Sequence, residues 1–388
     1  MTFSSSLPFQ PDNEREDLNG IRRKSICTKH SNGEEDLPEV RQVVFVKVHK
    51  AASSTVQNIL LRFAMARNLS VLLPKRGSIL GEVSVPIDRR NVVPHPEGKD
   101  KFDILCNHVV YNREEIDKYF PQNVVRIAIL REPLQQTLSA LKFYSTQFPL
   151  RALLDGVDKH AHDAINGFLR HPEDFYDPSD NKLMSFVNNR MSLDLGFNAQ
   201  HLDESKKDKK IIRQFVKHVE EEFDLVLISD YFDESMILFR RYLRWPMKDL
   251  IHLKVNTAQK HPSSSPFSLV PQMTPEIADA FRAWNRVDYG LYEYFLPVFL
   301  KTIQAEPRFD EELQTFRVVQ EKVANFCLKD NYNMTLNVSR NIWTDEFTVS
   351  KSDCKLMMTP EIPLVELVKR QQLYRYFDFR FGDHPLGA

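Results

Sequence analysis

The chain has 388 residues, of which 42% are apolar and 27% are charged, a composition typical of a soluble globular protein that buries a large core. Its 52 basic and 53 acidic side chains nearly cancel, so the net charge gives no field that would attract nucleic acid, and no nucleic-acid partner is expected. The sequence has neither an apolar run long enough to span a membrane nor the apolar stretch of a signal peptide. Residues 1–40 are predicted to be a disordered tail.

From residue 41 onward, short β-rich apolar runs alternate with segments of helical character. Strands are predicted at "VVFVKV", "FDILCNHVV" and "VVRIAIL", and the helices that follow them at Thr55 to Met65, Arg113 to Tyr119 and Leu134 to Phe143. A later pair, "FDLVLI" and "DESMILFRRYLRW", repeats the pattern. This alternation predicts an α/β fold with a parallel sheet flanked by helices. Ligand-binding residues are then expected at the carboxyl ends of the strands.

The later part of the chain predicts further helices. The segment from Leu150 to Lys210 is interpreted as a helical insertion over the sheet. After the Pro- and Ser-rich stretch "KHPSSSPFSLVPQMTPE", a strong helix with one apolar face is predicted. That face comprises Phe281, Trp284, Val287, Asp288, Leu291, Tyr292 and Phe295. Residues 306–388 are predicted to be a helical and irregular extension packed on a domain that spans residues 41–305.

The first strand leads through the glycine-free loop "KVHKAASST" into a helix. Several backbone N–H groups are unpaired at such a turn and the helix dipole adds positive charge, so the loop is suited to bind an anion. Lys50 can neutralise a phosphate, and Ser53, Ser54 and Thr55 supply hydroxyl groups that could also cap the helix. The loop lacks the glycines of a Walker motif, and no acidic residue for Mg²⁺ follows it, so no metal is expected. A capped helix with an incidental lysine is the structural alternative.

A second strand, loop and helix occur in "VVRIAILREPLQQTLSALKFY". Arg131 lies at the strand end, and Pro133 lies at the expected first helical position, where a missing N–H costs nothing. Ser139 follows two turns along the helix, and an arginine fork together with a hydroxyl suits an isolated phosphate. Two such loops after parallel strands, about 80 residues apart, together predict a nucleotide with phosphates at both ends of its ribose.

These segments carry a resemblance to a known family. "KVHKAASSTVQNIL" is similar to the 5′-phosphosulfate-binding loop of Golgi carbohydrate sulfotransferases, and "LREPLQQTLSALKFY" is similar to their 3′-phosphate-binding segment. The stretches "FDILCNHVVYN", "FDLVLISDYFDESMILFRRYLRW" and "WNRVDYGLYEYF" resemble blocks of the galactose 3-O-sulfotransferase family in the same order. The resemblance runs from about Val43 to Phe295, with a weaker similarity at "MMTPEI".

The resemblance implies a P-loop-like sulfotransferase fold that uses 3′-phosphoadenosine 5′-phosphosulfate (PAPS) as donor. It implies an enzyme that moves a sulfuryl group to the 3-hydroxyl of a terminal β-galactose on a glycolipid or glycan. Such chemistry needs a base for the hydroxyl proton and cations for the charge that develops on the sulfate. The donor-binding residues carried over are Lys47, Lys50, Ala51, Ala52, Ser53, Ser54, Thr55, Arg131 and Ser139.

Two histidines are candidates for the base, with Lys50 as the catalytic cation. His108 is the first candidate, because it lies where related uronyl 2-O-sulfotransferases place a catalytic histidine. His49 is its rival, because it lies in the phosphosulfate loop beside Lys50. The unperturbed pKa of histidine suits proton abstraction at neutral pH. Lys47 is expected to point to the same side as His49 by strand alternation, as a second cation.

The resemblance also implies a Golgi-lumenal enzyme, and family members carry an N-terminal membrane anchor that this sequence does not show. Sequons at Asn68, Asn333 and Asn337 agree with a lumenal domain, as does a C-terminal disulfide between Cys327 and Cys354. Free thiols remain the alternative for that pair, and Cys106 is expected in the core. Other functions left open are a small-molecule kinase, a uronyl 2-O-sulfotransferase and a non-catalytic nucleotide- or glycan-binding relative. The sequence does not fix which galactoside is the acceptor.

Overall fold

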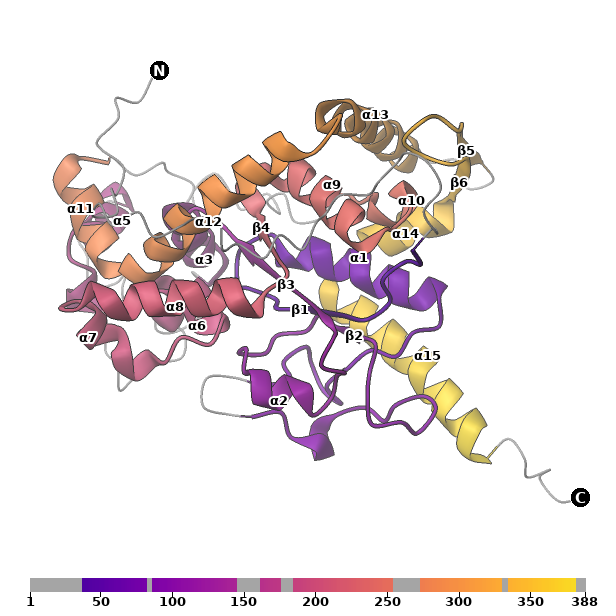
Figure 1. The fold of residues 1–388 in the computed structure, drawn as a ribbon, viewed down its shortest axis with the longest axis horizontal. Helices are drawn as coiled ribbons and strands as arrows, with labels where there is room; N and C mark the ends of the chain where they lie inside the picture. The colour runs from indigo at the N-terminus through magenta and orange to yellow at the C-terminus, as the bar shows by residue number, and fades with distance from the viewer. Residues whose placement is uncertain are drawn as a thin grey trace, which may run out of the picture. The chain divides into compact units, whose positions relative to one another are not determined.

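The computed structural model describes residues 37–81, 86–144, 161–175, 184–253, 273–329 and 334–381 (Figure 1). A parallel four-stranded sheet with the order β2-β1-β3-β4 lies within the compact unit Glu35–Ala388. Its strands are β1 (Val43–Phe45), β2 (Ile104–Leu105), β3 (Val125–Leu130) and β4 (Leu225–Ile228). The predicted α/β architecture with a helix-flanked parallel sheet is therefore confirmed.

The strands of the sheet are shorter than their apolar runs predict. Val43, Val44 and Phe45 are fully buried, as expected for a parallel strand that is covered on both faces. The Val46 N–H still donates to Ile127 O at 3.0 Å, but the Val48 N–H turns back to Val46 O at 3.0 Å. This turn ends β1 and releases the following residues from the sheet, so that their side chains are available for a site.

Helices follow the strands as the sequence predicts. They are α1 (Ser53–Ala66), α2 (Arg113–Asp117), α3 (Pro133–Tyr144) and α9 (Phe232–Leu243). From β1 the chain crosses to β2 on one side, whereas from β3 it crosses to β4 on the other side. The loops after the neighbouring strands β1 and β3 therefore diverge, and ligands of open α/β sheets bind at such a switch point.

The predicted insertion between residues 150 and 210 contains several short helices in its described part. They are α5 (Ala161–Arg170), η3 (Pro172–Phe175), η4 (Met184–Val187), α6 (Arg190–Asp194), η5 (Ala199–His201), α7 (Leu202–Ser205) and the start of α8 (Lys209–Glu222). Elsewhere the chain forms η2 (Arg89–Asn91), η6 (Ser229–Tyr231) and α10 (Met247–Leu250). Most of the Pro- and Ser-rich stretch lies outside the described residues.

The single helix predicted around Trp284 is wrong, because the chain forms two helices there. These are α11 (Pro275–Trp284) and α12 (Arg286–Ala305), with Asn285 between them. Asn189 explains the break: its Nδ2 donates to Trp284 O at 2.9 Å, and its Oδ1 accepts from Val287 N at 2.9 Å. One side chain thus satisfies backbone groups at the end of one helix and at the start of the next. The predicted apolar face is buried, apart from the half-buried Tyr292.

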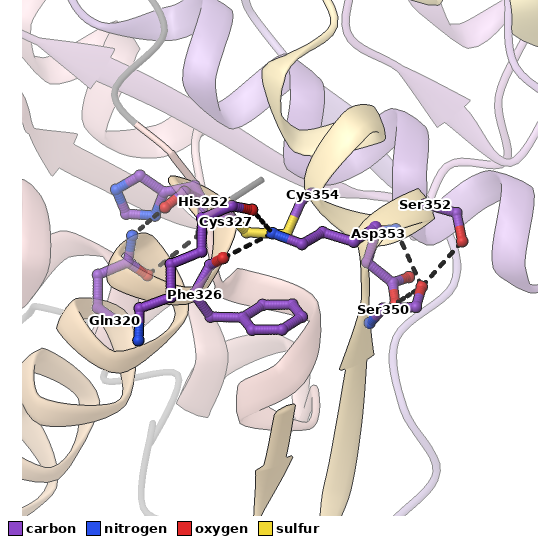
Figure 2. Close-up of a disulfide and its surroundings, with 10 residues drawn as sticks. His252, Gln320, Phe326, Cys327, Ser350, Ser352, Asp353 and Cys354 are labelled. Carbon is purple, nitrogen blue, oxygen red and sulfur yellow. Dashed lines mark hydrogen bonds between the residues drawn. A yellow bond between two sulfur atoms is a disulfide. The ribbon is translucent and has the colours of Figure 1, made fainter. Parts of the chain in front are cut away.

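The C-terminal part contains a β-hairpin that the sequence analysis did not predict. Its elements are α13 (Phe309–Cys327), β5 (Thr335–Val338), β6 (Phe347–Ser350), α14 (Lys351–Met358) and α15 (Glu361–Phe381). A disulfide joins Cys327 to Cys354 and so ties α13 to α14, as the resemblance implied (Figure 2). Cys106 is free and buried, as expected. No described helix is both long and apolar enough to cross a membrane.

We expect the Cys327→Ser/Cys354→Ser variant to lose about 3.5 kcal/mol of unfolding free energy. The disulfide joins residues that are 27 positions apart. Such a cross-link lowers the entropy of the unfolded chain, and the expected loss is the free energy that corresponds to this entropy. Urea denaturation without reductant measures the difference, with the Cys106→Ser variant as a control for loss of a thiol. Equal stability of the double variant and the wild type would contradict this expectation.

Candidate active site

The loop after β1 has the backbone of an anion site. Lys50 and Ala52 adopt the left-handed conformation, with φ of 60° and 58°. For residues with a Cβ this costs about 1–2 kcal/mol each, and such strain is typically retained at functional sites. Among the described residues, none accepts a hydrogen bond from the backbone N–H groups of residues 50–54. These N–H groups precede or begin α1, where the helix dipole favours an anion.

The hydroxyl groups of the loop do not cap α1, so that expectation is wrong. The N-cap of α1 is Ala52, whose side chain has no acceptor. Ser53 Oγ instead donates to Val48 O at 2.6 Å, and Ser54 Oγ donates to Glu361 Oε2 at 3.2 Å. Ser53 therefore holds the turn closed, and Ser54 links the loop to α15.

The second predicted loop meets the first. Arg131 follows β3, and its Nη1 donates to Lys50 O at 2.9 Å. Pro133 is the first residue of α3, as predicted, and Phe143 on that helix lies under Lys50, with Nζ 3.7 Å from the ring centroid. Ser139 is half-buried on α3, without a hydrogen bond from its side chain to another described residue. The two predicted phosphate loops thus form one region of the molecule.

Lys50 and Arg131 are both cationic. Among the described residues, no carboxylate forms an ion pair with either of them. Burial, followed by the charges of Lys47 and Arg131, lowers the pKa of Lys50 to about 8. Burial also lowers the pKa of Arg131. A bound anion would supply the missing negative charge, so these two side chains fit a phosphate or sulfate ligand.

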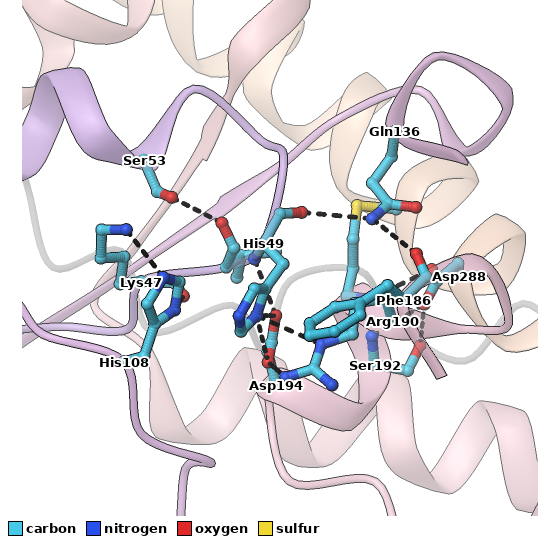
Figure 3. Close-up of polar contacts among 12 residues, drawn as sticks. Lys47, His49, Ser53, His108, Gln136, Phe186, Arg190, Ser192, Asp194 and Asp288 are labelled. Carbon is cyan, nitrogen blue, oxygen red and sulfur yellow. Dashed lines mark hydrogen bonds and ion pairs between the residues drawn. The ribbon is translucent and has the colours of Figure 1, made fainter. Parts of the chain in front are cut away.

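His49 is held by a buried carboxylate from α6 (Figure 3). Asp194 accepts from the His49 backbone N–H at 2.8 Å, and His49 Nδ1 lies 2.9 Å from Asp194 Oδ2. Arg190 Nη2 donates to Asp194 Oδ1 at 2.6 Å. Burial alone would raise the pKa of Asp194, but Arg190 and His49 outweigh it and lower that pKa to about 2.

The Asp194 carboxylate determines which nitrogen of His49 is basic. A carboxylate only accepts hydrogen bonds, and both Asp194 oxygens, at 3.0 and 2.9 Å, lie closer to Nδ1 than the Arg190 Nε–H donor, at 3.2 Å, so we assign the ring proton to Nδ1. Nε2 then carries the lone pair, and no described residue donates to it. Burial lowers the pKa of His49, which keeps the ring neutral near pH 7. His49 and Asp194 therefore form a histidine–carboxylate pair suited to proton abstraction.

Both nitrogens of His108 are occupied by Lys47. His108 Nδ1 lies 3.1 Å from Lys47 O, and Nε2 lies 2.8 Å from Lys47 Nζ. The carbonyl oxygen only accepts, so Nδ1 carries the proton and Nε2 accepts from the ammonium. Burial, followed by the charge of Lys47, lowers the pKa of His108 well below its usual value. The two imidazole rings stack with centroids 3.9 Å apart, so His108 lies directly against His49.

Several residues of this region were not predicted from the sequence. Gln136 Nε2 donates to His49 O and to Phe186 O, each at 3.2 Å, and the Phe186 ring centroid lies 4.8 Å from that of His49. Gln136 follows Arg131 by five residues, so its position on the helix after the second loop could have indicated that it lies near the site. Nothing in the sequence indicated Asp194, because it belongs to a different segment with no recognisable motif.

A cavity lies beside the first turns of α1. Its lining residues are Ser54, Thr55, Gln57, Asn58, Leu61, His252, Leu253, Met357, Thr359, Pro360, Glu361 and Leu364. The cavity thus adjoins Ser54 and Thr55 at the start of α1. The described residues contain no group of three or more His, Cys, Asp or Glu side chains that could hold a metal ion.

The fold and the site define an α/β protein with a cationic anion-binding loop and a histidine–carboxylate pair at the carboxyl ends of adjacent parallel strands. A sequence model of the family described as Galactose-3-O-sulfotransferase matches residues 18–347. The chain belongs to the galactose-3-O-sulfotransferase family, whose members are enzymes. This confirms the family resemblance of the sequence.

Sequence similarity to individual members of the family supports this assignment. Mouse galactose-3-O-sulfotransferase 2 is 33% identical over 299 residues, which cover 76% of this chain and 71% of the relative. Bovine galactose-3-O-sulfotransferase 3 is 31% identical over 295 residues, covering 76% of this chain and 65% of the relative. Human galactosylceramide sulfotransferase is 30% identical over 291 residues, which cover 74% of this chain and 64% of the relative.

Proposed function

We propose that this chain transfers a sulfuryl group from PAPS to the 3-hydroxyl of a terminal β-galactose on a glycolipid or glycan. Membership of the galactose-3-O-sulfotransferase family supports the reaction class. The observation that carries the proposal for the donor site is the hydrogen bond from Arg131 to Lys50 O, at 2.9 Å, which joins the two predicted phosphate loops.

The donor's two anionic ends have separate groups to bind them. We assign the 5′-phosphosulfate to Lys50, to the backbone N–H groups of residues 51–54 and to the Thr55 hydroxyl, because the hydroxyls of Ser53 and Ser54 already donate to Val48 O and Glu361. The 3′-phosphate is assigned to Arg131 and Ser139. Lys47 is a weaker candidate for donor binding, because Glu361 Oε2 lies 3.0 Å from its ammonium and already neutralises it.

His49 is the base that the geometry favours. Its Nε2 takes the proton of the galactose 3-hydroxyl while that oxygen forms a bond to sulfur and the sulfur–oxygen bond to the 5′-phosphate breaks. Asp194 stabilises the imidazolium that results, through the hydrogen bond from Nδ1. Lys50 stabilises the charge that develops on the leaving oxygen. His108, the first candidate from the sequence, is left to support His49 by stacking and to bind Lys47.

The pH dependence of kcat/KM for the donor is expected to be bell-shaped. The acid limb should lie below pH 6.5, because burial lowers the pKa of His49 and the base is active when neutral. The alkaline limb should lie near pH 8, because Lys50 has a pKa of about 8 and binds the donor when charged. Initial rates between pH 5 and 10 measure both limbs, and Lys50→Arg should move only the alkaline limb upward. An unmoved alkaline limb in that variant would remove Lys50 from the assignment.

A transfer assay with ³⁵S-labelled PAPS tests the proposed reaction. The acceptor panel should contain galactosylceramide, N-acetyllactosamine, an O-glycan core galactoside and a uronic-acid polysaccharide, and the linkage of the product should be determined. We expect label on O3 of terminal β-galactose. Label on the uronic acid would indicate the 2-O activity instead, and donor binding without transfer to any acceptor would indicate a non-catalytic relative.

We infer a Golgi-lumenal location from the family. The disulfide between Cys327 and Cys354 supports this location, because disulfides persist in oxidising compartments. Immunofluorescence of the full-length protein against a Golgi marker tests the inference.

A further inference from the structure

We propose that Glu361 is a positioning residue, which holds Lys47 against His108, so that of these two stacked histidines His49 is the one with a free basic nitrogen. Glu361 begins α15, beyond residues 18–347 that the family model matches and within the "MMTPEI" segment of weaker similarity. Its Oε2 accepts from Lys47 Nζ at 3.0 Å and from Ser54 Oγ at 3.2 Å. This inference rests on the proposed function, because it assigns a role within the same reaction.

Lys47 needs a negative partner in order to stay charged. Its side chain is 2% exposed, and a buried ammonium is costly unless it is paired and hydrogen-bonded. The titratable and charged groups around it are His49, Lys50, Cys106, His108, Arg190, Asp194 and Glu361. Glu361 is the carboxylate that contacts Lys47 directly among the described residues. Burial lowers the pKa of Lys47, and the charge and hydrogen bond of Glu361 oppose that shift and favour the ammonium that donates to His108.

The Lys47 ammonium in turn blocks His108. It donates to His108 Nε2 at 2.8 Å, while the ring's other nitrogen donates to Lys47 O. With Nε2 engaged, His108 has no free lone pair for an acceptor hydroxyl. A relay from Glu361 through Lys47 thus fixes the tautomer and orientation of the ring that stacks on His49.

Helix α15 has other anchors, so its docking does not depend on the Glu361 ion pair. Leu364, Val365 and Val368 are buried against the core. Gln372 accepts from Val71 N at 3.0 Å and donates to Pro94 O at 3.1 Å. We therefore expect the Glu361→Gln variant to keep α15 in place, which makes it a clean test of the relay.

The same helix offers a matched control. Glu366 pairs with the buried Lys369 at 2.5 Å, and neither belongs to the loop region described above. Glu366→Gln thus removes a carboxylate partner from a buried lysine of α15 and leaves Lys47 untouched. A general effect of losing such a pair would appear in both variants, whereas the relay predicts an effect in Glu361→Gln alone.

The first measurement needs no substrate: ¹⁵N NMR of histidine-labelled protein, with His108→Gln to assign the ring signals. Glu361→Gln should shift the Nε2 signal of His108, and Glu366→Gln should not. Lys47→Met should give a shift of the same kind, which keeps the test valid if Glu361→Gln fails to fold. An unshifted His108 signal in both Glu361→Gln and Lys47→Met would overturn the proposal, whether or not the protein sulfates galactose.

The second measurement is kinetic. Glu361→Gln should lower kcat by roughly tenfold, as expected for the loss of one charge-assisted interaction, and should leave the donor KM within about twofold. The Lys47→Met/Glu361→Gln double variant should lose no more than Lys47→Met alone, because both substitutions break the same relay. Additive losses would overturn the proposal. A lower donor KM in Glu361→Gln would also overturn it, since Glu361 would then be competing with the donor for the loop.

Discussion

The His49→Gln variant is expected to lose about 10²–10⁴-fold in kcat, the range for removal of a general base. Its loop should still bind 3′-phosphoadenosine 5′-phosphate, because the groups assigned to the donor lie outside the imidazole. The physical reason is the Asp194 carboxylate, which holds the Nδ1 proton and directs a free Nε2 lone pair to the acceptor. Single-turnover kinetics with a galactoside, alongside calorimetric titration of the nucleotide, separate the two effects.

His108→Gln is the comparison that decides which histidine is the base. We expect this variant to lose roughly tenfold in kcat, because His108 supports the other ring and its Nε2 is already bonded to Lys47. If His108→Gln abolished turnover while His49→Gln kept most of it, the first candidate from the sequence would be the base. The assignment to His49 would then be withdrawn.

Arg131→Ala is expected to raise the donor KM by about 10–100-fold, the equivalent of one hydrogen bond to a charged group. Arg131 is the cation assigned to the 3′-phosphate, and its Nη1 also supports the Lys50 carbonyl at 2.9 Å. The donor KM of Arg131→Lys should lie between those of Arg131→Ala and the wild type, because an ammonium keeps the charge but lacks the planar fork of a guanidinium. Initial rates at varied PAPS measure the effect.

Arg90→Ala is the matched control for that substitution. Arg90 is 90% exposed and pairs with Asp88 away from the loops, so its loss should leave the donor KM unchanged. An equal rise in KM in both variants would mean that net charge, and not the Arg131 contact, controls donor binding.

The sheet could be predicted because its strands are apolar runs joined to helices with clear periodicity. The run "VVRIAIL" became β3 and the segment after it became α3, with Pro133 at the expected position. The break at Asn285 could not be predicted, because it depends on hydrogen bonds from Asn189, a residue about 100 positions earlier in the chain. The periodicity continues through the break, so the sequence alone indicates one helix.

The site residues that come directly after a strand could be predicted from the sequence, and those that come from other elements could not. Lys50 and Arg131 come directly after β1 and β3, whose pairing brings the loops together. Asp194 and Glu361 reach the same place from α6 and α15, and their contacts span 145 and 314 residues. No local pattern marks Asp194, and the weak similarity at "MMTPEI", which contains Glu361, gives that carboxylate no role, yet these two residues decide which histidine is free. The choice between His49 and His108 therefore required tertiary structure.

A calorimetric comparison of two nucleotides on two proteins tests directly whether the loops after β1 and β3 hold opposite ends of one donor. Wild-type protein should bind one 3′-phosphoadenosine 5′-phosphate per chain, more tightly than adenosine 5′-phosphate, and Arg131→Ala should bind the two nucleotides about equally. If Arg131→Ala still preferred the 3′-phosphorylated nucleotide by the wild-type ratio, the loop after β3 would not hold that phosphate and the account would be contradicted.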